Sequence, residues 1–248
     1  MNDFSLQSRI LYQNSACVVV NKLSGEAAEG AGERQADLQL MLKDYLKSGF
    51  AEAVNRLDVP VTGCSLFALN SSSLKFLNAA FADKHGSVIK KYWAVIEKPD
   101  KKIPESGELI HWIETNTRIN KSFAYNENAQ GRKKASLAYK ISGEGKNYLF
   151  LEVRLLTGRH HQIRSQFEKA GLHIKGDLKY GAKRSEKDGG IRLHAGYLSF
   201  NNPLNKDELI EVISDPPVMD NLWQSFKNHS LSCPITSVAE QVLSIPEL

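Results

Sequence analysis

Three short stretches of the chain place reactive side chains among apolar neighbours, and the first surrounds Asp58. In an extended segment residues two apart share a face, so Arg56 and Asp58 would point the same way while Leu57 points toward the core. Pro60 and Gly63 follow at once, an order that suits a rigid strand end presenting a carboxylate to a cleft. The same pattern more often marks a structural Arg–Asp ion pair or a turn-capping Asp, and both interpretations stay open at this point.

The second stretch has the sequence TGRHHQIR and begins at Thr157. Its glycine permits a tight turn from a strand into a helix, and helical spacing would then put His160 and Arg164 on one face while His161 and Gln162 point elsewhere. So many donors at a helix start suit contacts to phosphate or carboxylate. A solvated polar helix face is the alternative. We predict no metal site, because adjacent histidines diverge on a helix and no third ligand stands at a suitable spacing.

The third stretch is a strand-like run, KKYWAV, that begins at residue 90. Strand alternation sends Tyr92 and Ala94 to one face, and Lys91, Trp93 and Val95 to the other. An aromatic ring beside lysines can stack on a nucleobase close to a phosphate. A Tyr-Trp pair in a strand is more often part of the core and its rim, so this run alone decides nothing.

The elements that must position these residues follow from periodicity and turn signals. Alternating and β-branched runs predict a strand pair over 9–22 and strands at 53–57, 64–69, 88–97, 108–114, 134–141, 148–156, 191–200 and 208–213. Helical spacing predicts helices at 35–47, 159–170 and 218–226, and a fourth from the serines at 71–73, which can cap it, to about residue 84, where Gly86 stops it.

Runs of strands interrupted by isolated helices favour an α+β fold with a largely antiparallel mixed β-sheet, flanking helices and a central cleft. We predict one continuous domain at 10–228, with an extension at 1–9 and a tail at 229–248. Division of its sheet into two halves about the cleft would be compatible with this interpretation.

The composition excludes several classes of protein. The 248 residues are 42% hydrophobic and 24% charged with a net charge of +4, which is globular and permits a polyanionic partner without proving one. Cys17, Cys64 and Cys233 are far apart, so neither a disulfide framework nor a zinc ribbon is expected, and Cys64 is expected to be an inert core thiol. The N-terminus lacks the features of a secretory signal and no apolar run approaches the roughly 20 residues of a membrane helix, so we expect a soluble, cytoplasmic protein.

Taken together and in order, these stretches resemble the RluA branch of the RNA pseudouridine synthases. The match covers about residues 10–226 and consists of ILYQNSACVVVNKLSG, NRLDVPVTGCSLFA, KKYWAV, KASLAYKI with LEVRLLTGRHHQIRSQF, GDLKYG and LHAGYLSF. The HQIR sequence favours the RluA branch over its sister branch. The resemblance implies the pseudouridine synthase fold and an isomerase that converts uridine to pseudouridine in structured RNA, rRNA or tRNA, without a cofactor.

The resemblance also implies roles for single residues. Asp58 would be the essential catalytic carboxylate, attacking either the anomeric carbon or the pyrimidine ring, and Arg164 would pair with it and aim it. Tyr92 would stack on the flipped uracil, and its hydroxyl is a candidate for removing the proton from carbon five. Arg56 would fill the gap that the uridine leaves in the RNA.

Further RNA contacts are expected from Arg159, His161, Gln162 and Lys91, and substrate choice from loops at 23–34 and 116–131. The chain departs from the family pattern at three places: it has Asn55 where His is usual, Val61-Thr62-Gly63 where Thr-Ser-Gly is usual, and His160 where Thr is common. We expect a monomer, because no exposed apolar stripe suggests an obligate dimer.

Two competing functions remain at this stage. The first is a catalytically silent RNA-binding protein on the same scaffold. The second is a hydrolase site built from Asp58 and the histidines, although it lacks both a metal set and a nucleophile–base pair. The retained set of Asp58, Tyr92 and Arg164 favours the synthase, because a protein that only binds RNA has no need of a buried carboxylate facing an anionic partner.

Overall fold

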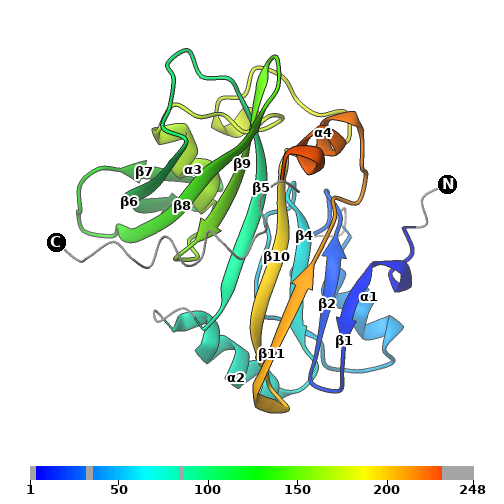
Figure 1. The fold of residues 1–248 in the computed structure, drawn as a ribbon. Helices are drawn as coiled ribbons and strands as arrows, with labels where there is room; N and C mark the ends of the chain where they lie inside the picture. The colour runs from blue at the N-terminus through cyan, green and yellow to red at the C-terminus, as the bar shows by residue number, and fades with distance from the viewer. Residues whose placement is uncertain (1–3, 32–35, 84–86, 231–248) are drawn as a thin grey trace.

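A computed structural model describes residues 4–31, 36–83 and 87–230. Its strands form one mixed sheet in the order β1-β2-β4-β10-β5-β9-β8-β6-β7, with β11 paired to β10 and β3 to β4 (Figure 1). All of these pairs are antiparallel except β4 with β10. The α+β class and the largely antiparallel mixed sheet are confirmed.

The strands are β1 (Ile10–Gln13), β2 (Cys17–Lys22), β3 (Glu52–Ala53), β4 (Thr62–Ala68), β5 (Ile89–Glu97), β6 (Ser106–Asn116), β7 (Lys121–Tyr125), β8 (Lys133–Glu144), β9 (Tyr148–Leu155), β10 (Leu193–Asn202) and β11 (Asn205–Ile213). The helices are α1 (Leu38–Tyr45), α2 (Ser71–Ala82), α3 (Gln162–Lys169) and α4 (Asn221–Ser230), with short 3-10 turns η1 (Gln7–Arg9) and η2 (Leu178–Tyr180). Among the residues described, no helix is both long and apolar enough to span a membrane.

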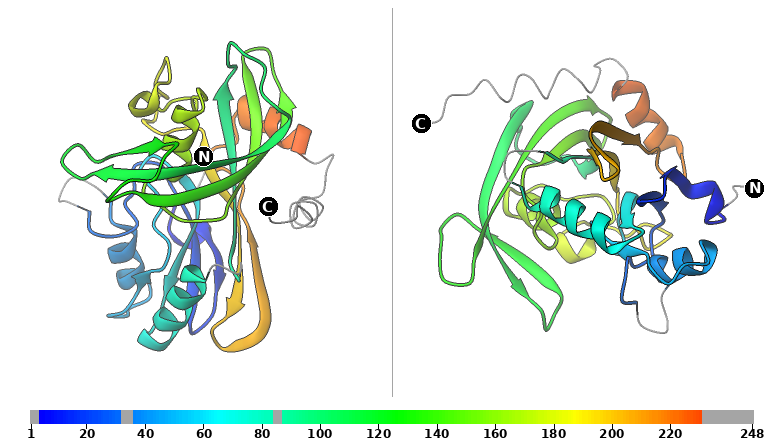
Figure 2. Two further views of the ribbon diagram at one scale, coloured as in Figure 1. Left: turned by 90° about the vertical axis from the view of Figure 1, so that its left-hand side faces the viewer. Right: turned by 90° about the horizontal axis from the view of Figure 1, so that it is seen from below.

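The sheet bends into two parts that share the long strand β5. Strands β1, β2, β4, β10 and β11 form one part, while β6 to β9 form the other and project from the side of the molecule (Figures 1 and 2). Helix α3 packs on β6 and β7 of the projecting part. The loop that carries Asp58 leads into β4, so the two parts bring α3 and this loop toward each other.

Strand β5 separates two clusters of the core. Tyr92 and Ala94 pack with Leu193 in one cluster, and Trp93 and Val95 pack with the aromatic side chains of Phe150, Trp223 and Phe226 in another. The alternation predicted for this strand is therefore confirmed. It places Tyr92 on the face of the sheet that carries the site.

Two element predictions in this region were wrong for identifiable reasons. The strand predicted at 53–57 ends at Ala53, because the Asn55 amide bonds the main chain of β4: its oxygen accepts the Leu66 N–H at 2.6 Å, and its nitrogen donates to the Cys64 carbonyl at 3.1 Å. The side chain thus takes the place of ladder hydrogen bonds. Helix α2 is capped by Asn70, whose side chain accepts the Ser73 N–H at 2.9 Å, and not by the serines.

Two further differences lie next to the site. Strand β7 occupies part of the loop predicted at 116–131 and pairs with β6. Helix α3 begins at Gln162 and not at Arg159, because His161 has left-handed backbone angles, φ 51° and ψ 30°. The predicted helical spacing of His160 and Arg164 is therefore wrong. Gly86 and Cys233 lie outside the described residues.

Candidate active site

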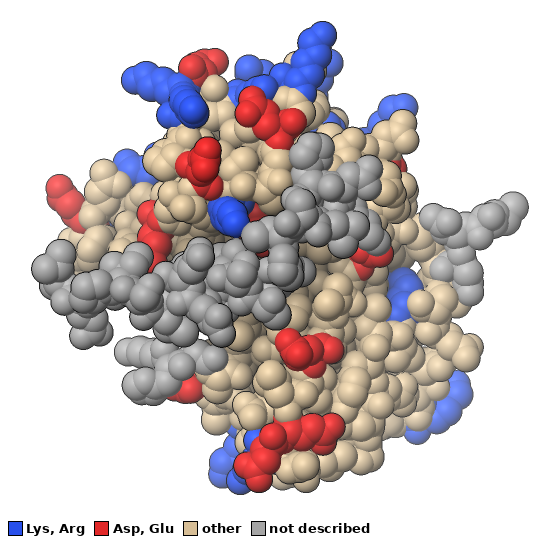
Figure 3. Space-filling view, in the orientation of Figure 1, with Lys and Arg blue, Asp and Glu red and all other residues tan. Residues whose placement is uncertain are grey.

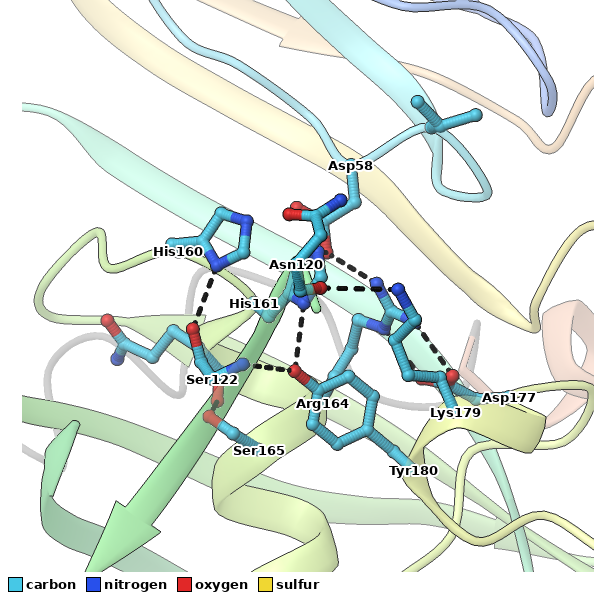
Figure 4. A network of polar contacts seen from close by, with 12 residues as sticks. Asp58, Asn120, Ser122, His160, His161, Arg164, Ser165, Asp177, Lys179 and Tyr180 are labelled. Carbon is cyan, nitrogen blue, oxygen red and sulfur yellow. Dashed lines mark hydrogen bonds and ion pairs between the residues drawn. The ribbon is translucent and has the colours of Figure 1, made fainter. Parts of the chain in front are cut away.

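A chain of two carboxylates and one guanidinium forms the centre of the candidate site (Figure 4). Arg164 Nη1 donates to Asp58 Oδ2 at 3.0 Å, while its Nε and Nη2 donate to the two carboxylate oxygens of Asp177 at 2.7 and 2.8 Å. The side chains of Arg164 and Asp177 are 5% and 1% exposed, but that of Asp58 is 20% exposed. The predicted Asp58–Arg164 pair is confirmed, and Asp58 is its accessible end.

Arg164 keeps its positive charge despite its burial. Burial alone would lower its pKa, but the hydrogen bonds and charge of Asp177, followed by those of Asp58, raise it above the usual value. A guanidinium presents its donors in a rigid planar fork. Asp177 binds the edge of that fork formed by Nε and Nη2. The third nitrogen, Nη1, is thereby directed toward Asp58.

Hydrogen bonds from Lys22 and from the main chain hold the loop that carries Asp58. Lys22, fully buried at the end of β2, donates from Nζ to the carbonyl oxygens of Leu23 at 2.8 Å and Val59 at 3.1 Å. The Val59 carbonyl also accepts the Gly25 N–H at 2.9 Å. Burial lowers the pKa of Lys22 to about 8, although Glu26 and Asp58 oppose this shift. In the sequence, Lys22 stands out only as a member of the N-terminal motif.

Tyr92 is almost fully buried on β5, beside the site. Burial, and then the negative charge of Asp58, raise the pKa of its phenol above the usual value. The phenol of Tyr92 is therefore neutral, and its expected part in the site stays a prediction.

A second network joins α3 to the projecting part of the sheet. The Tyr180 hydroxyl oxygen accepts the Ser122 N–H at 2.9 Å and lies 2.8 Å from His161 Nδ1. The Ser122 amide and the His161 ring therefore meet at this one hydroxyl. His161 Nε2 lies 3.7 Å from Asp58 Oδ2, too far for a hydrogen bond.

His161 is neutral, so its approach to Asp58 is not an ion pair. Burial lowers its pKa to about 3, and the positive charge of Arg164 acts in the same direction. The Arg164 guanidinium carbon lies 4.7 Å from the centre of the Tyr180 ring. The two networks therefore share Tyr180 and pack as one unit around Asp58.

A sequence model described as RNA pseudouridylate synthase matches residues 16–169, more than half of the chain. The chain belongs to the RNA pseudouridylate synthase family. The resemblance seen in the motifs is thereby confirmed.

Three curated members of this family illustrate the similarity. The chain is 28% identical over 214 residues to the ribosomal large subunit pseudouridine synthase C of Vibrio parahaemolyticus, and the alignment covers 84% of this chain and 65% of that protein. It is 34% identical over 180 residues to the protein of the same name in Rickettsia felis, and that alignment covers 70% of this chain and 56% of the Rickettsia protein. It is 30% identical over 203 residues to an uncharacterized RNA pseudouridine synthase of Zymomonas mobilis, and that alignment covers 79% of this chain and 88% of that protein. The chain thus spans less than two thirds of the Vibrio and Rickettsia proteins.

Two solved structures share the fold. Human RNA pseudouridylate synthase domain containing 4 superposes with a TM-score of 0.69 at 20% identity, covering 92% of this chain and 94% of that one. Human RNA pseudouridylate synthase domain containing 1 gives 0.69 at 21% identity and covers both chains fully. The predicted pseudouridine synthase fold is confirmed.

The residues expected to contact RNA lie in different settings in this family member. Arg56 is 74% exposed and pairs with Glu29 at 3.4 Å. Arg159 is exposed and donates from Nε to a main-chain carbonyl of β8 at 3.1 Å. Their RNA contacts stay predictions.

Gln162 and Lys91, which were also expected to contact RNA, are less accessible to a ligand at Asp58. Gln162 is buried, and both ends of its amide are used inside the protein, by Thr157 Oγ1 at 2.8 Å and by the Ser136 carbonyl at 3.0 Å. Lys91 lies on the face of β5 opposite to Tyr92, with Nζ 5.2 Å from the centre of the Tyr197 ring. These contacts favour a positioning role for Gln162 and place Lys91 away from Asp58.

Three residues of the site escaped the sequence analysis: Asp177, Tyr180 and Ser122. The first two lie in the GDLKYG motif, which was part of the resemblance but received no role. Ser122 lies in β7, which was expected to be loop. The divergence predicted for His160 and His161 is also wrong, since their rings stack with centroids 3.8 Å apart. Both residues precede α3, so helical geometry does not apply to them.

Proposed function

We propose that the protein is an RNA pseudouridine synthase that isomerises uridine to pseudouridine in structured RNA, with Asp58 as its essential carboxylate. The observation that carries this proposal is the Asp58 carboxylate itself, aimed by the buried Arg164–Asp177 pair and left partly exposed. Membership of the family supports the reaction type. One catalytic domain at 10–228 would carry the activity as a monomer.

The reaction fits a site of this composition. The bond from the ribose anomeric carbon to N1 of the base breaks, a bond from the same carbon to carbon five forms, the proton on carbon five leaves, and N1 gains a proton. No group is added and no electron is exchanged with another molecule, so positioning and a carboxylate are sufficient. Asp58 would attack the anomeric carbon or the pyrimidine ring, and both routes remain open.

Tyr92 fits the first of its two proposed roles better than the second. A buried, neutral phenol ring next to Asp58 offers a flat apolar surface on which an extruded uracil can stack. Its raised pKa weighs against removal of the proton from carbon five, because a neutral phenol is a weak base. We therefore assign Tyr92 to holding the base while it turns.

We propose rRNA of the large ribosomal subunit as the substrate, with tRNA as the second candidate. The support is the naming of the Vibrio and Rickettsia relatives as ribosomal large subunit pseudouridine synthases. Such a substrate would be met in the cytoplasm, which is where we propose that the protein acts.

The direct test is chemical mapping of pseudouridine in rRNA and tRNA from cells with and without the gene. The proposal predicts that at least one pseudouridine disappears from large-subunit rRNA and returns when the gene, but not its Asp58→Asn form, is restored. An unchanged modification pattern would refute the activity. Full restoration by Asp58→Asn would refute the role of the carboxylate and favour the silent RNA-binding protein.

A further inference from the structure

His160 lies close to Asp58 and takes no part in the chemistry derived so far. Its side chain is exposed, whereas those of its neighbours His161 and Ser122 are buried. In the view of Figure 4, His160 and Arg164 flank Asp58 from opposite sides. A nucleoside placed at Asp58 would therefore lie beside His160.

Although it is exposed, His160 is held in one orientation by two buried side chains. Its Nδ1 lies 2.8 Å from Ser122 Oγ, and its ring stacks on that of His161 with an interplanar angle of 22°. Ser122 Oγ is itself held by Thr115 Oγ1 at 3.0 Å. Because Nδ1 faces Ser122, the Nε2 edge is turned the other way. A surface group held in this manner is already ordered before a ligand arrives.

The charges around His160 suit an anion. Burial of part of the ring lowers the pKa of His160, and the positive charges of Arg164, Arg56 and Lys179 act in the same direction, while Asp58 opposes them. Arg56 and Lys179 are exposed, and Lys179 Nζ is steadied by the main-chain carbonyl of Asn120 at 3.2 Å. A phosphate beside His160 would meet the imidazole, Lys179 and Arg56, whose guanidinium is 74% exposed and pairs with Glu29 at 3.4 Å.

We propose that His160 binds, through Nε2, a phosphate group of the nucleotide that enters the site, with Arg56 and Lys179 as the accompanying cations. The proposal rests on the proposed function, since it names the part of the RNA that His160 recognises. The uracil would enter toward Asp58 and Tyr92, and the sugar–phosphate chain would remain beside His160. His160 is thus a binding residue of the substrate and not a participant in the bond exchange.

The test uses release of tritium from a large-subunit rRNA transcript labelled at carbon five of uridine, with KM and kcat measured separately. His160→Leu should raise KM about tenfold and leave kcat within about twofold, the loss expected for one hydrogen bond to a charged group. His160→Gln should recover most of the KM, because its amide nitrogen can reach the position of Nε2. Lys206→Gln, at an exposed lysine near the start of β11, should leave both constants unchanged.

Other outcomes contradict the proposal in distinguishable ways. If His160 only supports His161, kcat falls and His160→Gln does not restore it. An unchanged KM in His160→Leu refutes only the contact between His160 and the phosphate. Absence of tritium release by the unaltered protein refutes the proposed function, and the phosphate contact with it. Should His160→Leu fail to fold, His160→Thr, which has the residue common in the family, tests the same prediction.

A second measurement asks whether the contacted group is phosphate. Uridine and its 3′- and 5′-monophosphates are compared as inhibitors of tritium release. At least one monophosphate should inhibit the unaltered protein about tenfold more strongly than uridine, and this advantage should shrink in His160→Leu. An advantage of the same size in both proteins would show that another residue binds the phosphate.

Discussion

Asp177 determines how Arg164 can act on Asp58. It takes two of the guanidinium donors, at 2.7 and 2.8 Å, and leaves Nη1 for the carboxylate of Asp58. Asp177 is therefore a positioning residue, because it reaches the reacting atoms only through Arg164. Its own place is set by the turn that leads into η2.

Replacing Asp177 with Asn should damage both stability and turnover. The change removes the negative charge that balances a buried guanidinium, and we expect the free energy of unfolding in urea to fall by about 3 kcal/mol. Turnover should fall about tenfold or more at saturating RNA, because Arg164 no longer has a defined direction. Glu168→Gln, which removes the half-exposed partner of Lys121, is the control and should cost less than about 1 kcal/mol. Equal effects of the two changes would contradict this role of Asp177.

At the residue scale, ordered motifs predicted the pair at the centre of the site but not its support. Asp58 and Arg164 are 106 residues apart, and the resemblance alone joined them. Asp177 and Tyr180 could not be assigned roles, because a turn of six residues shows no periodicity from which the direction of a side chain follows. His161 was misplaced because its left-handed backbone is not the one expected for a residue with a Cβ.

Among the elements, the pairing of β4 with β10 sets the end of the Asp58 loop. Gly63 has φ +115°, and a Cβ there would lie 2.4 Å from the carbonyl oxygen of Ala195. The two strands can approach this closely only because residue 63 has no side chain. The pairing of Thr62 and Gly63 with β10 thus fixes the start of β4 and, with it, the end of the loop that carries Asp58.

Gly63→Ala should therefore destabilise the fold by about 3 kcal/mol, through backbone strain and displacement of β10. Gly49→Ala is a matched control, since nothing lies within 4 Å of the Cβ it would add. Urea unfolding of the two variants measures both effects. A loss at Gly63 no larger than that at Gly49 would contradict the close approach.

His194 joins three elements and should make the fold sensitive to acid. It lies fully buried on β10, with Nδ1 2.8 Å from Thr62 Oγ1 and Nε2 2.9 Å from the Ser214 carbonyl, so Nε2 carries the proton. Burial lowers its pKa to about 4, although the Ser214 carbonyl opposes this shift. An unfolded histidine has a pKa of about 6.5.

Between pH 6.5 and 4 the unfolded chain therefore binds more protons at residue 194 than the folded chain. As the pH drops from 6.5 to 4, protonation linked to His194 should lower the free energy of unfolding by about 3 kcal/mol. Above pH 6.5 the stabilisation from His194 is fully present. His161, with its pKa near 3, adds to the fall. His194→Gln should flatten the pH dependence of urea unfolding, and an unchanged slope would contradict the assignment.

Elements with a strong alternating pattern were predicted well, and weakly patterned ones were not. The faces of strand β5 were correctly assigned, because its residues 92–96 send alternate side chains into two different clusters of the core. Strand β7 has five residues and its buried member is a serine, so no apolar alternation marks it. It forms only because β6 and α3 lie beside it, which is tertiary information.

At the scale of the whole molecule, the charge is modest and spread over the surface. The 32 basic and 28 acidic residues leave +4, and on the face shown in Figure 3 the two signs are interspersed. The proposed affinity for RNA would then come from local cations such as Arg56 and Lys179 rather than from a basic coat. The two parts of the sheet place these cations on different elements, with Arg56 before β4 and Lys179 in η2.

Binding of RNA should still depend steeply on salt, because each phosphate contact releases counterions. With Asp58→Asn as the binding form, we expect the affinity for a large-subunit rRNA transcript to fall about tenfold or more between 50 and 200 mM salt. Filter binding over that range is the measurement. A flat response would count against RNA as the substrate.

The most direct test of the account is tritium release from labelled large-subunit rRNA by the unaltered protein and by Asp58→Asn, measured side by side. We expect turnover by the first and a loss of at least about a thousandfold in the second, with RNA binding and the urea unfolding transition of the variant largely retained. Turnover by Asp58→Asn at the rate of the unaltered protein would contradict the central claim that this carboxylate carries the reaction.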